Sequence, residues 1–150
     1  MKILLAVISP HKAGPSGGAL ELLQLYMRRA SKYCPCSYLT YPSETKLLAS
    51  IALAAGRTRP VILLTDSQGE ELTSAGIATI LGTFQDTGLQ QLIVAIGPAD
   101  GWSSAALAIA DRTIAFGRIT LPHELAAVVA AEQIYRALTI RAGHPYHCGH

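Results

Sequence analysis

The last residues of the chain bring together side chains that can do chemistry near neutral pH. The segment HPYHCGH holds three histidines, one tyrosine and one cysteine within seven residues. A histidine side chain has an ordinary pKa of about 6.5 and can therefore take up or release a proton near pH 7. From the residues alone this tail is open to three interpretations: a disordered terminus, a structural metal site, or one half of an active site.

The metal interpretation is the weakest of the three. Pro145 and Gly149 make the tail irregular, and no second group of ligands occurs elsewhere in the chain. Cys34 and Cys36 form a C-x-C pair, which few closed metal sites use. We therefore expect no bound metal. Three cysteines without a C-x-x-C motif also argue against a disulfide framework and indicate reduced thiols in the cytosol.

Three loops form a second region of interest. TDSQGEE follows the apolar run VILLT, GPADGW follows QLIVAI, and GRITLPH follows TIAF. Ligands of open α/β sheets bind beyond the carboxyl ends of the strands, so these loops are predicted to form one crevice. Gly97 and Gly101 bracket the middle loop and would let the main chain approach a ligand closely, although an ordinary tight turn also needs glycine.

The third loop leads into a helix. Pro122 suits the first turn of a helix because its missing N–H costs nothing there, and Thr120 is a candidate cap. Main-chain donors at such a helix start can hold polar groups of a ligand. We interpret His123 as a structural hydrogen-bonding residue rather than as a catalyst.

Alternating apolar runs and turn residues predict the elements that position these loops. Ser16 and Ser43 are candidate caps at helix starts, and Gly56 is a candidate helix end. Strands that are apolar throughout, separated by helices, predict an α/β fold with a parallel sheet covered on both faces, in a single domain over residues 1–150. Strands are predicted at 2–8, 36–41, 61–65, 91–97 and 112–116, and helices at 19–33, 43–56, 73–88, 103–110 and 121–141.

Composition and charge bear on partners. Half of the residues are hydrophobic and 15% are charged, which predicts that a partner subunit covers part of the surface. No apolar run has the length of a membrane span, and the opening MKILLAVISPHK is too short and too polar for a secretory signal, so we expect a cytoplasmic protein. Eight Lys and Arg occur up to Arg59, whereas 60–111 has six acids and neither Lys nor Arg. The basic half could bind phosphates, although charge alone favours an ordinary solvated helix face.

Several motifs together resemble a known family. IGPADG, TLPHELAAVVAAEQIYRALTI and HPYH, in this order, are similar to motifs of the RlmH family of SPOUT methyltransferases, as are LTDSQGEELTS and LYMRRASKYC. The resemblance covers essentially the whole chain. It implies methylation of N3 of a pseudouridine in 23S ribosomal RNA, S-adenosylmethionine as cofactor, a C-terminal trefoil knot, and a homodimer in which the tail of one subunit completes the site of the other. The target base is expected in a loop, because a base within an A-form stem offers no reachable N3. The net charge of only +2 predicts weak binding to free RNA, so the assembled ribosome is the expected substrate.

The resemblance also assigns roles to particular residues. Asp66 falls beside the cofactor residues, and Tyr146 and His147 fall at the positions that meet the target base. The implied cofactor residues are Thr65, Gly97, Gly101, Ile119, Thr120, Leu121, Pro122 and His123. Basic residues assigned to RNA are Arg136, from the resemblance, and Lys12, Arg28 and Arg29, from the charge pattern.

The chemistry that follows is methyl transfer to a ring nitrogen. The N3–H of pseudouridine must lose its proton, so His147 is predicted to act as base or proton relay and Tyr146 to position the base. Three features depart from the family pattern: Pro98 removes an N–H from the cofactor loop, Cys148 replaces a basic residue, and the segment SPHKAGPSGG differs from the family's usual glycine-lysine opening. Two alternatives therefore stay open, namely a non-catalytic dimeric SAM- or nucleotide-binding protein associated with the ribosome, and a SPOUT enzyme acting on transfer RNA.

Overall fold

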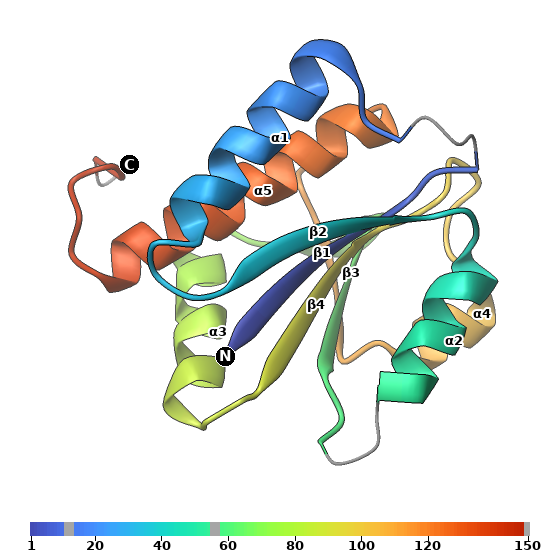
Figure 1. The fold of residues 1–150 in the computed structure, drawn as a ribbon, viewed down its shortest axis with the longest axis horizontal. Helices are drawn as coiled ribbons and strands as arrows, with labels where there is room; N and C mark the ends of the chain where they lie inside the picture. Colours follow the sequence, from blue (N-terminus) through green and yellow to red (C-terminus); the bar gives the residue numbers. More distant parts are fainter. Residues whose placement is uncertain (11–13, 55–57, 149–150) are drawn as a thin grey trace.

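The computed structural model describes residues 1–10, 14–54 and 58–148. Five strands alternate with five helices over these residues (Figure 1). The strands are β1 (Lys2–Ile8), β2 (Cys36–Tyr41), β3 (Val61–Glu71), β4 (Gln91–Ile96) and β5 (Arg112–Ala115). The helices are α1 (Gly17–Ala30), α2 (Glu44–Ala54), α3 (Ser74–Asp86), α4 (Ser104–Ile109) and α5 (His123–Arg141).

The strands form one sheet in the order β2-β1-β4-β3-β5, and every neighbouring pair is parallel. The predicted α/β fold with a parallel sheet is therefore confirmed. Because all strands run the same way, the loops after β3, β4 and β5 leave the sheet at one edge.

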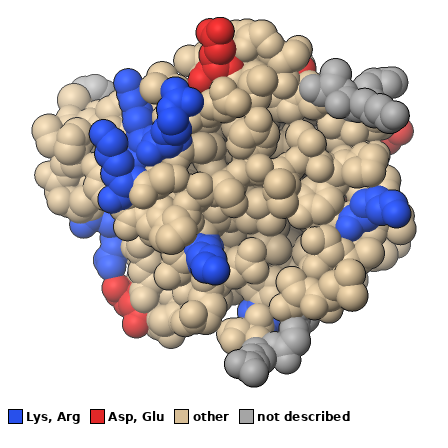
Figure 2. All heavy atoms as spheres, viewed as in Figure 1, with Lys and Arg blue, Asp and Glu red and all other residues tan. Residues whose placement is uncertain are grey.

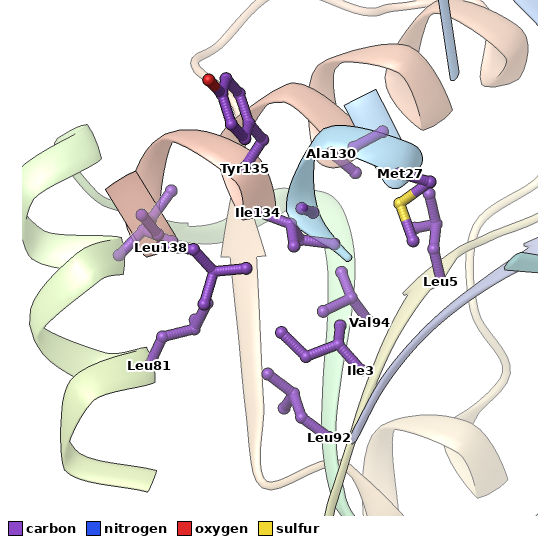
Figure 3. Close-up of a cluster of buried hydrophobic side chains, with 14 of the residues drawn as sticks. Ile3, Leu5, Met27, Leu81, Leu92, Val94, Ala130, Ile134, Tyr135 and Leu138 are labelled. Atoms are coloured by element: carbon purple, nitrogen blue, oxygen red, sulfur yellow. The ribbon is translucent and has the colours of Figure 1, made fainter. Parts of the chain in front are cut away.

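Helices cover both faces of this sheet, as expected (Figure 1). Side chains of β1 alternate between the faces: Ile3, Leu5 and Val7 pack with α1, α3 and α5, whereas Leu4, Ala6 and Ile8 pack with α2 and α4. The larger cluster is shown in Figure 3, where Ile134 and Leu138 of α5 point toward the sheet. This packing fixes α5, and with it the loop that precedes α5, against the rigid part of the fold.

The predicted end of the third strand is wrong. β3 continues to Glu71, and its pairing with β5 is interrupted between Thr65 and Glu70. A Cβ added at Gly69 would lie 2.7 Å from the main-chain carbon of Ile114, so the two chains approach each other closely there. The segment TDSQGEE looks like a loop because its pattern is polar, whereas its extended form depends on a strand that follows much later in the sequence.

The helix starts agree in part with the predicted caps. The hydroxyl of Ser43 accepts a hydrogen bond from the Lys46 N–H at 3.2 Å, as a cap should. Ser16 takes the position before α1, but its side chain makes no capping bond there. The candidate helix end at Gly56 lies outside the described residues. None of the helices in the described ranges has the length and hydrophobicity needed to cross a membrane.

Candidate active site

A cavity of about 520 Å³ lies next to the middle of β3 and the loops after β4 and β5. The structure brings all the predicted cofactor residues together in its wall, along with Asp66 and Pro98. These predicted residues are Thr65, Gly97, Gly101, Ile119, Thr120, Leu121, Pro122 and His123. The three predicted segments therefore form one crevice, although the first of them lies within β3, where its pairing with β5 is interrupted, and only the other two are loops.

Trp102 forms part of the wall and was missed by sequence reasoning. It is only 8% exposed, and its indole N–H donates a hydrogen bond to the main-chain oxygen of Thr65 at 2.9 Å. The indole ring lies so close to Gly97 that a Cβ at this glycine would be 2.7 Å from the ring. Trp102 thus ties the loop after β4 to β3, and Gly97 leaves the room that the ring needs. The only tryptophan of the chain, directly after Gly101, was the available signal.

The loop after β4 makes a tight turn. The N–H of Gly101 donates to the main-chain oxygen of Pro98 at 3.0 Å, and Gly101 has a φ of +84°. A residue with a side chain rarely adopts that conformation, so the turn itself needs this glycine. Pro98 contributes its carbonyl group to the turn, which is compatible with the missing N–H that distinguishes it from the family pattern.

A carboxylate from another part of the chain holds the far end of this loop. Glu44, at the start of α2, accepts hydrogen bonds from the N–H of Ser103 at 2.8 Å and from its hydroxyl at 2.5 Å. Ser103 in turn caps α4 by accepting from the Ala106 N–H at 3.2 Å. Because Ser103 follows Trp102 directly, Glu44 restrains the wall of the cavity. No local pattern connects residues 59 positions apart, so this contact could not be predicted from the sequence.

The loop before α5 supplies the opposite wall, and here the predicted cap is wrong. The helix begins at His123, with Pro122 in the preceding position at a ψ of 143°. Its carbonyl accepts the first helical hydrogen bond, from the Ala126 N–H at 2.9 Å. Thr120 lies outside the helix and lines the cavity instead. The fixed φ of proline is compatible with either position, and the extended ψ places Pro122 just before the helix.

The C-terminal tail folds back onto the middle of α5 and is not a free end. The Tyr146 hydroxyl donates to Oε1 of Glu132 at 2.9 Å, and its ring lies 4.6 Å, between centroids, from that of Tyr135. Burial raises the pKa of Tyr146, and its contacts with Tyr26 and Glu132 raise it further. Tyr146 is thus a neutral phenol at pH 7 and is not a base.

Arg136 joins the tail to the same carboxylate. Its guanidinium contacts Glu132 at 2.6 Å, and the two side chains are 26% and 16% exposed. Hydrogen bonding to Glu132 raises the pKa of Arg136, which stays charged. Its Nη1 lies 3.1 Å from Nδ1 of His147, and the guanidinium lies 4.8 Å from the ring centre of Tyr146. The ion pair between Glu132 and Arg136 could be predicted, because an acid four residues before an arginine is a favourable spacing in a helix. The role of this pair in holding the tail could not be predicted.

The contact between Arg136 and His147 selects one tautomer of a neutral imidazole. Arginine has donors only, so Nδ1 of His147 must accept, and a neutral ring then carries its proton on Nε2. In this arrangement His147 offers a donor, not a free lone pair, to a neighbouring group.

The tail and the cavity are apart within one chain. Residues of the tail are absent from the cavity wall, as far as the structure describes the chain. Glu132 lies nine residues beyond His123 in α5, which is about 14 Å along a helix axis. Figure 1 shows the tail at the opposite end of α5 from the cavity edge of the sheet.

The basic residues assigned to RNA fall in different places. Arg29 lies over the rings of Tyr26 and Tyr135, at 5.7 and 5.9 Å from their centres, on the same side as Arg136. Arg28 is exposed and lines a separate shallow groove. Lys12 lies outside the described residues. Figure 2 shows Lys and Arg side chains gathered at the upper left of the face, where α1 and the tail lie in Figure 1.

A comparison with protein families agrees with this geometry. The family model described as "Predicted SPOUT methyltransferase" matches residues 1–147. The chain belongs to the SPOUT methyltransferase family. This result confirms the family and the methyltransferase class to which the motifs pointed.

Within the described residues, no three His, Cys, Asp or Glu side chains are grouped as metal ligands.

Two curated relatives of this SPOUT protein share one name. Ribosomal RNA large subunit methyltransferase H of Koribacter versatilis is 46% identical over 125 residues, covering 83% of this chain and 85% of the relative. The protein of the same name from Rhizobium rhizogenes is 36% identical, covering 98% and 99%.

Solved SPOUT structures share the fold at low identity. The tRNA (m1G37) methyltransferase from Aquifex aeolicus matches with a TM-score of 0.58 and 12% identity, over all of this chain and 73% of that one. The SpoU methyltransferase AviRb from Streptomyces viridochromogenes, in complex with the cofactor AdoMet, matches with a TM-score of 0.51 and 16% identity, over 96% of this chain and 58% of AviRb. These likenesses concern the fold.

Proposed function

We propose that this SPOUT protein transfers a methyl group from S-adenosylmethionine to N3 of a pseudouridine in a loop of 23S ribosomal RNA. It would act in the cytoplasm, as a single domain over residues 1–150, on the assembled ribosome. The observation that carries the proposal is the cavity, which gathers the cofactor motifs at one edge of the sheet. Relatives at up to 46% identity that are named as ribosomal RNA methyltransferases support the substrate class.

The cavity fits the cofactor in size and chemistry. Its volume of about 520 Å³ is in the range typical of small-molecule sites. Apolar side chains, among them Ile96, Phe116 and Leu121, can pack against an adenine, and the Asp66 carboxylate can accept hydrogen bonds from ribose hydroxyls. When bound, S-adenosylmethionine supplies the methyl group on a positively charged sulfur. The chain's own part is then to hold donor and acceptor in line.

We propose further that the catalytic residues come from the partner subunit of a homodimer. Tyr146 and His147 lie far from the cavity of their own chain, so a tail that works must reach a cavity in a second copy. The apolar composition, with half of the residues hydrophobic, supports a covered surface.

His147 and Tyr146 would act on the pseudouridine. The neutral Tyr146 hydroxyl, which is held by Glu132, would orient the base. For His147 to take the N3 proton on Nδ1, Arg136 must leave that nitrogen. An RNA phosphate that draws the guanidinium of Arg136 away would free Nδ1 at the moment of binding. With Nδ1 still occupied, His147 could only donate from Nε2 to an oxygen of the base.

RNA contacts would come from the basic side chains of the tail and of the first half of the chain. Arg136, Arg28, Arg29 and Lys12 are the residues proposed for phosphates. With a net charge of only +2, the protein should bind free RNA weakly, and an assembled ribosome would supply further contacts. Tight binding to an isolated stem-loop at physiological salt would contradict this part.

Transfer of a labelled methyl group to ribosomes that lack the modification tests the proposal. The intact chain should label large-subunit RNA, whereas a version ending at Gly143 should bind S-adenosylmethionine without transferring the methyl group. If the intact chain binds the cofactor and labels no RNA, the protein is a non-catalytic binding factor. Label in transfer RNA instead of ribosomal RNA would change the substrate class.

A further inference from the structure

Cys34 and Cys36 form a pair of thiols that the methyl-transfer chemistry does not use. Cys34 lies in the turn from α1 to β2 and Cys36 is the first residue of β2, with their sulfur atoms 3.8 Å apart. Both are partly buried and partly open to solvent, and both are free thiols. The tail thiol of Cys148 is also free and is exposed, which provides an internal reference.

The main chain around the pair is held on both sides. The carbonyl of Pro35, between the two cysteines, accepts from the Ile3 N–H at 2.9 Å. The carbonyl of Cys36 accepts from the Ser31 hydroxyl at 3.0 Å, and the Ser31 hydroxyl also reaches the carbonyl of Met27 at 2.8 Å. The two sulfurs therefore face each other in a restrained turn, and their encounter does not depend on a chance movement of a free loop.

The two thiols differ in acidity. A hydrogen bond from the Cys36 thiol lowers the pKa of Cys34, although burial opposes the effect. The same hydrogen bond raises the pKa of Cys36, and burial adds to the increase. Cys34 is thus the thiol that ionises first, with Cys36 as its donor. A low-pKa, accessible thiol beside a second cysteine is the arrangement found in redox-sensitive sites.

We propose that Cys34 and Cys36 are a reversible oxidation site, in which Cys34 reacts with a peroxide and Cys36 closes a disulfide. The Cys34 thiolate attacks the O–O bond of hydrogen peroxide, which gives a sulfenic acid and hydroxide. The sulfur of Cys36 then attacks the sulfenic sulfur, a disulfide forms, and water leaves with the thiol proton. Overall, one dithiol and one molecule of hydrogen peroxide give one disulfide and two molecules of water.

The surroundings of Cys36 allow the site to be reset. A shallow groove of about 300 Å³ is lined by Cys36, Arg28 and Tyr38. Through it a small thiol can reach the disulfide, and two such thiols restore the pair while forming their own disulfide. The charged Arg28 favours thiols that carry carboxylates. The two cysteines have no part in methyl transfer, and Arg28 is the one groove residue that is also proposed to contact RNA. Oxidation of the thiols and labelling of RNA are read separately, so neither proposal fails with the other.

The test uses the full chain. Proteolysis afterwards places the Cys34–Cys36 pair and Cys148 in different peptides, so that each can be followed by its mass. Cleavage after Lys and Arg leaves Cys34 and Cys36 together in residues 33–46 and Cys148 alone in residues 142–150. After brief exposure to limiting hydrogen peroxide and alkylation, peptide 33–46 should lose the mass of two hydrogens. It should do so about ten times faster than Cys148 is oxidised, because the more acidic thiol reacts first.

Two variants separate the roles, each checked for an unchanged melting curve. C36S should stop at the sulfenic acid, which dimedone traps on Cys34, and C34S should slow oxidation of the remaining thiol about tenfold. The proposal is overturned if peptide 33–46 keeps both thiols while Cys148 is oxidised, if the product is a disulfide between two chains, or if C34S reacts as fast as wild type.

Discussion

The cavity is shaped mainly by main chain, whereas the tail is held mainly by side chains. Around the cavity, glycines, a proline and main-chain hydrogen bonds set the form, and the segment 60–111 that supplies two of its loops has neither Lys nor Arg. The tail depends on one carboxylate, Glu132, that gathers Arg136 and Tyr146. A cofactor of fixed shape suits a rigid wall, and a charged RNA suits side chains that can exchange partners. The two regions should therefore fail separately.

The variant His147→Ala should give the largest difference between an effect on the tail and an effect on the cavity. Loss of a proton acceptor should lower the rate of methyl transfer about 100-fold or more. The affinity for S-adenosylmethionine should not change, since the cavity of the chain is intact. Single-turnover methyl transfer and calorimetric cofactor titration measure the two effects. C148S, which alters an exposed thiol nearby, is the control, and normal turnover in H147A would remove His147 from the mechanism.

Gly97→Ala should damage the other region. The new Cβ would lie 2.7 Å from the Trp102 ring, so the ring or the loop must shift. Overpacking of this kind costs about 1–3 kcal/mol, which corresponds to cofactor binding weaker by roughly 5- to 150-fold. Gly18→Ala, where a Cβ meets no atom within 4 Å, is the control. Cofactor titration of both variants checks the prediction. Wild-type affinity in G97A would show that the Trp102 ring or the loop can move aside without loss of binding.

Glu44→Gln tests whether the cavity also depends on one side-chain contact. The amide keeps an acceptor for Ser103 but loses the charge, and a hydrogen bond of this kind contributes about 1 kcal/mol. Cofactor affinity should fall roughly fivefold, with turnover at saturation unchanged. E21Q, on the exposed side of α1, is the matched control. An equal fall in turnover would mean that Glu44 acts on the chemical step and not on the wall.

The smallest effect concerns the pH dependence of the tail. Because burial raises the pKa of Tyr146 above its ordinary value, the folded chain favours the neutral phenol. Its contribution to stability is complete below the ordinary tyrosine pKa of about 10 and is lost as pH rises above it. Phenolate absorbance against pH should show one late-ionising tyrosine in the wild type that Y146F lacks. If wild type and Y146F showed the same phenolate absorbance at high pH in the late part of the titration, Tyr146 would be exposed to solvent.

Much of the fold and of the cavity could be predicted because their signals are local. Apolar runs such as KILLAVI marked the strands, and the turn glycine Gly101 marked the loop after β4. The continuation of β3 past Thr65 could not be predicted, because its polar residues are extended only through pairing with β5. The prediction that Thr120 caps the last helix was wrong for a different reason, because Pro122 is compatible both with the first turn of a helix and with the position just before it.

The C-terminal trefoil knot and the homodimer stay predictions of the family resemblance. Both concern how the chain passes through itself or meets a second copy, and neither is a property of a short segment. The roles of Tyr146 and His147 depend on the same second copy, since one chain keeps them away from its own cavity.

By itself the sequence determined the alternation of strands and helices, the parallel sheet and the loops that meet at its edge, because periodicity and turn residues act over a few positions. Only the tertiary structure decided that Glu44 holds Ser103, that Trp102 packs under Gly97, and that Glu132 holds the hydroxyl of Tyr146. These contacts join segments through space, and their geometry is fixed by the packing of helices on the sheet, which no local pattern encodes.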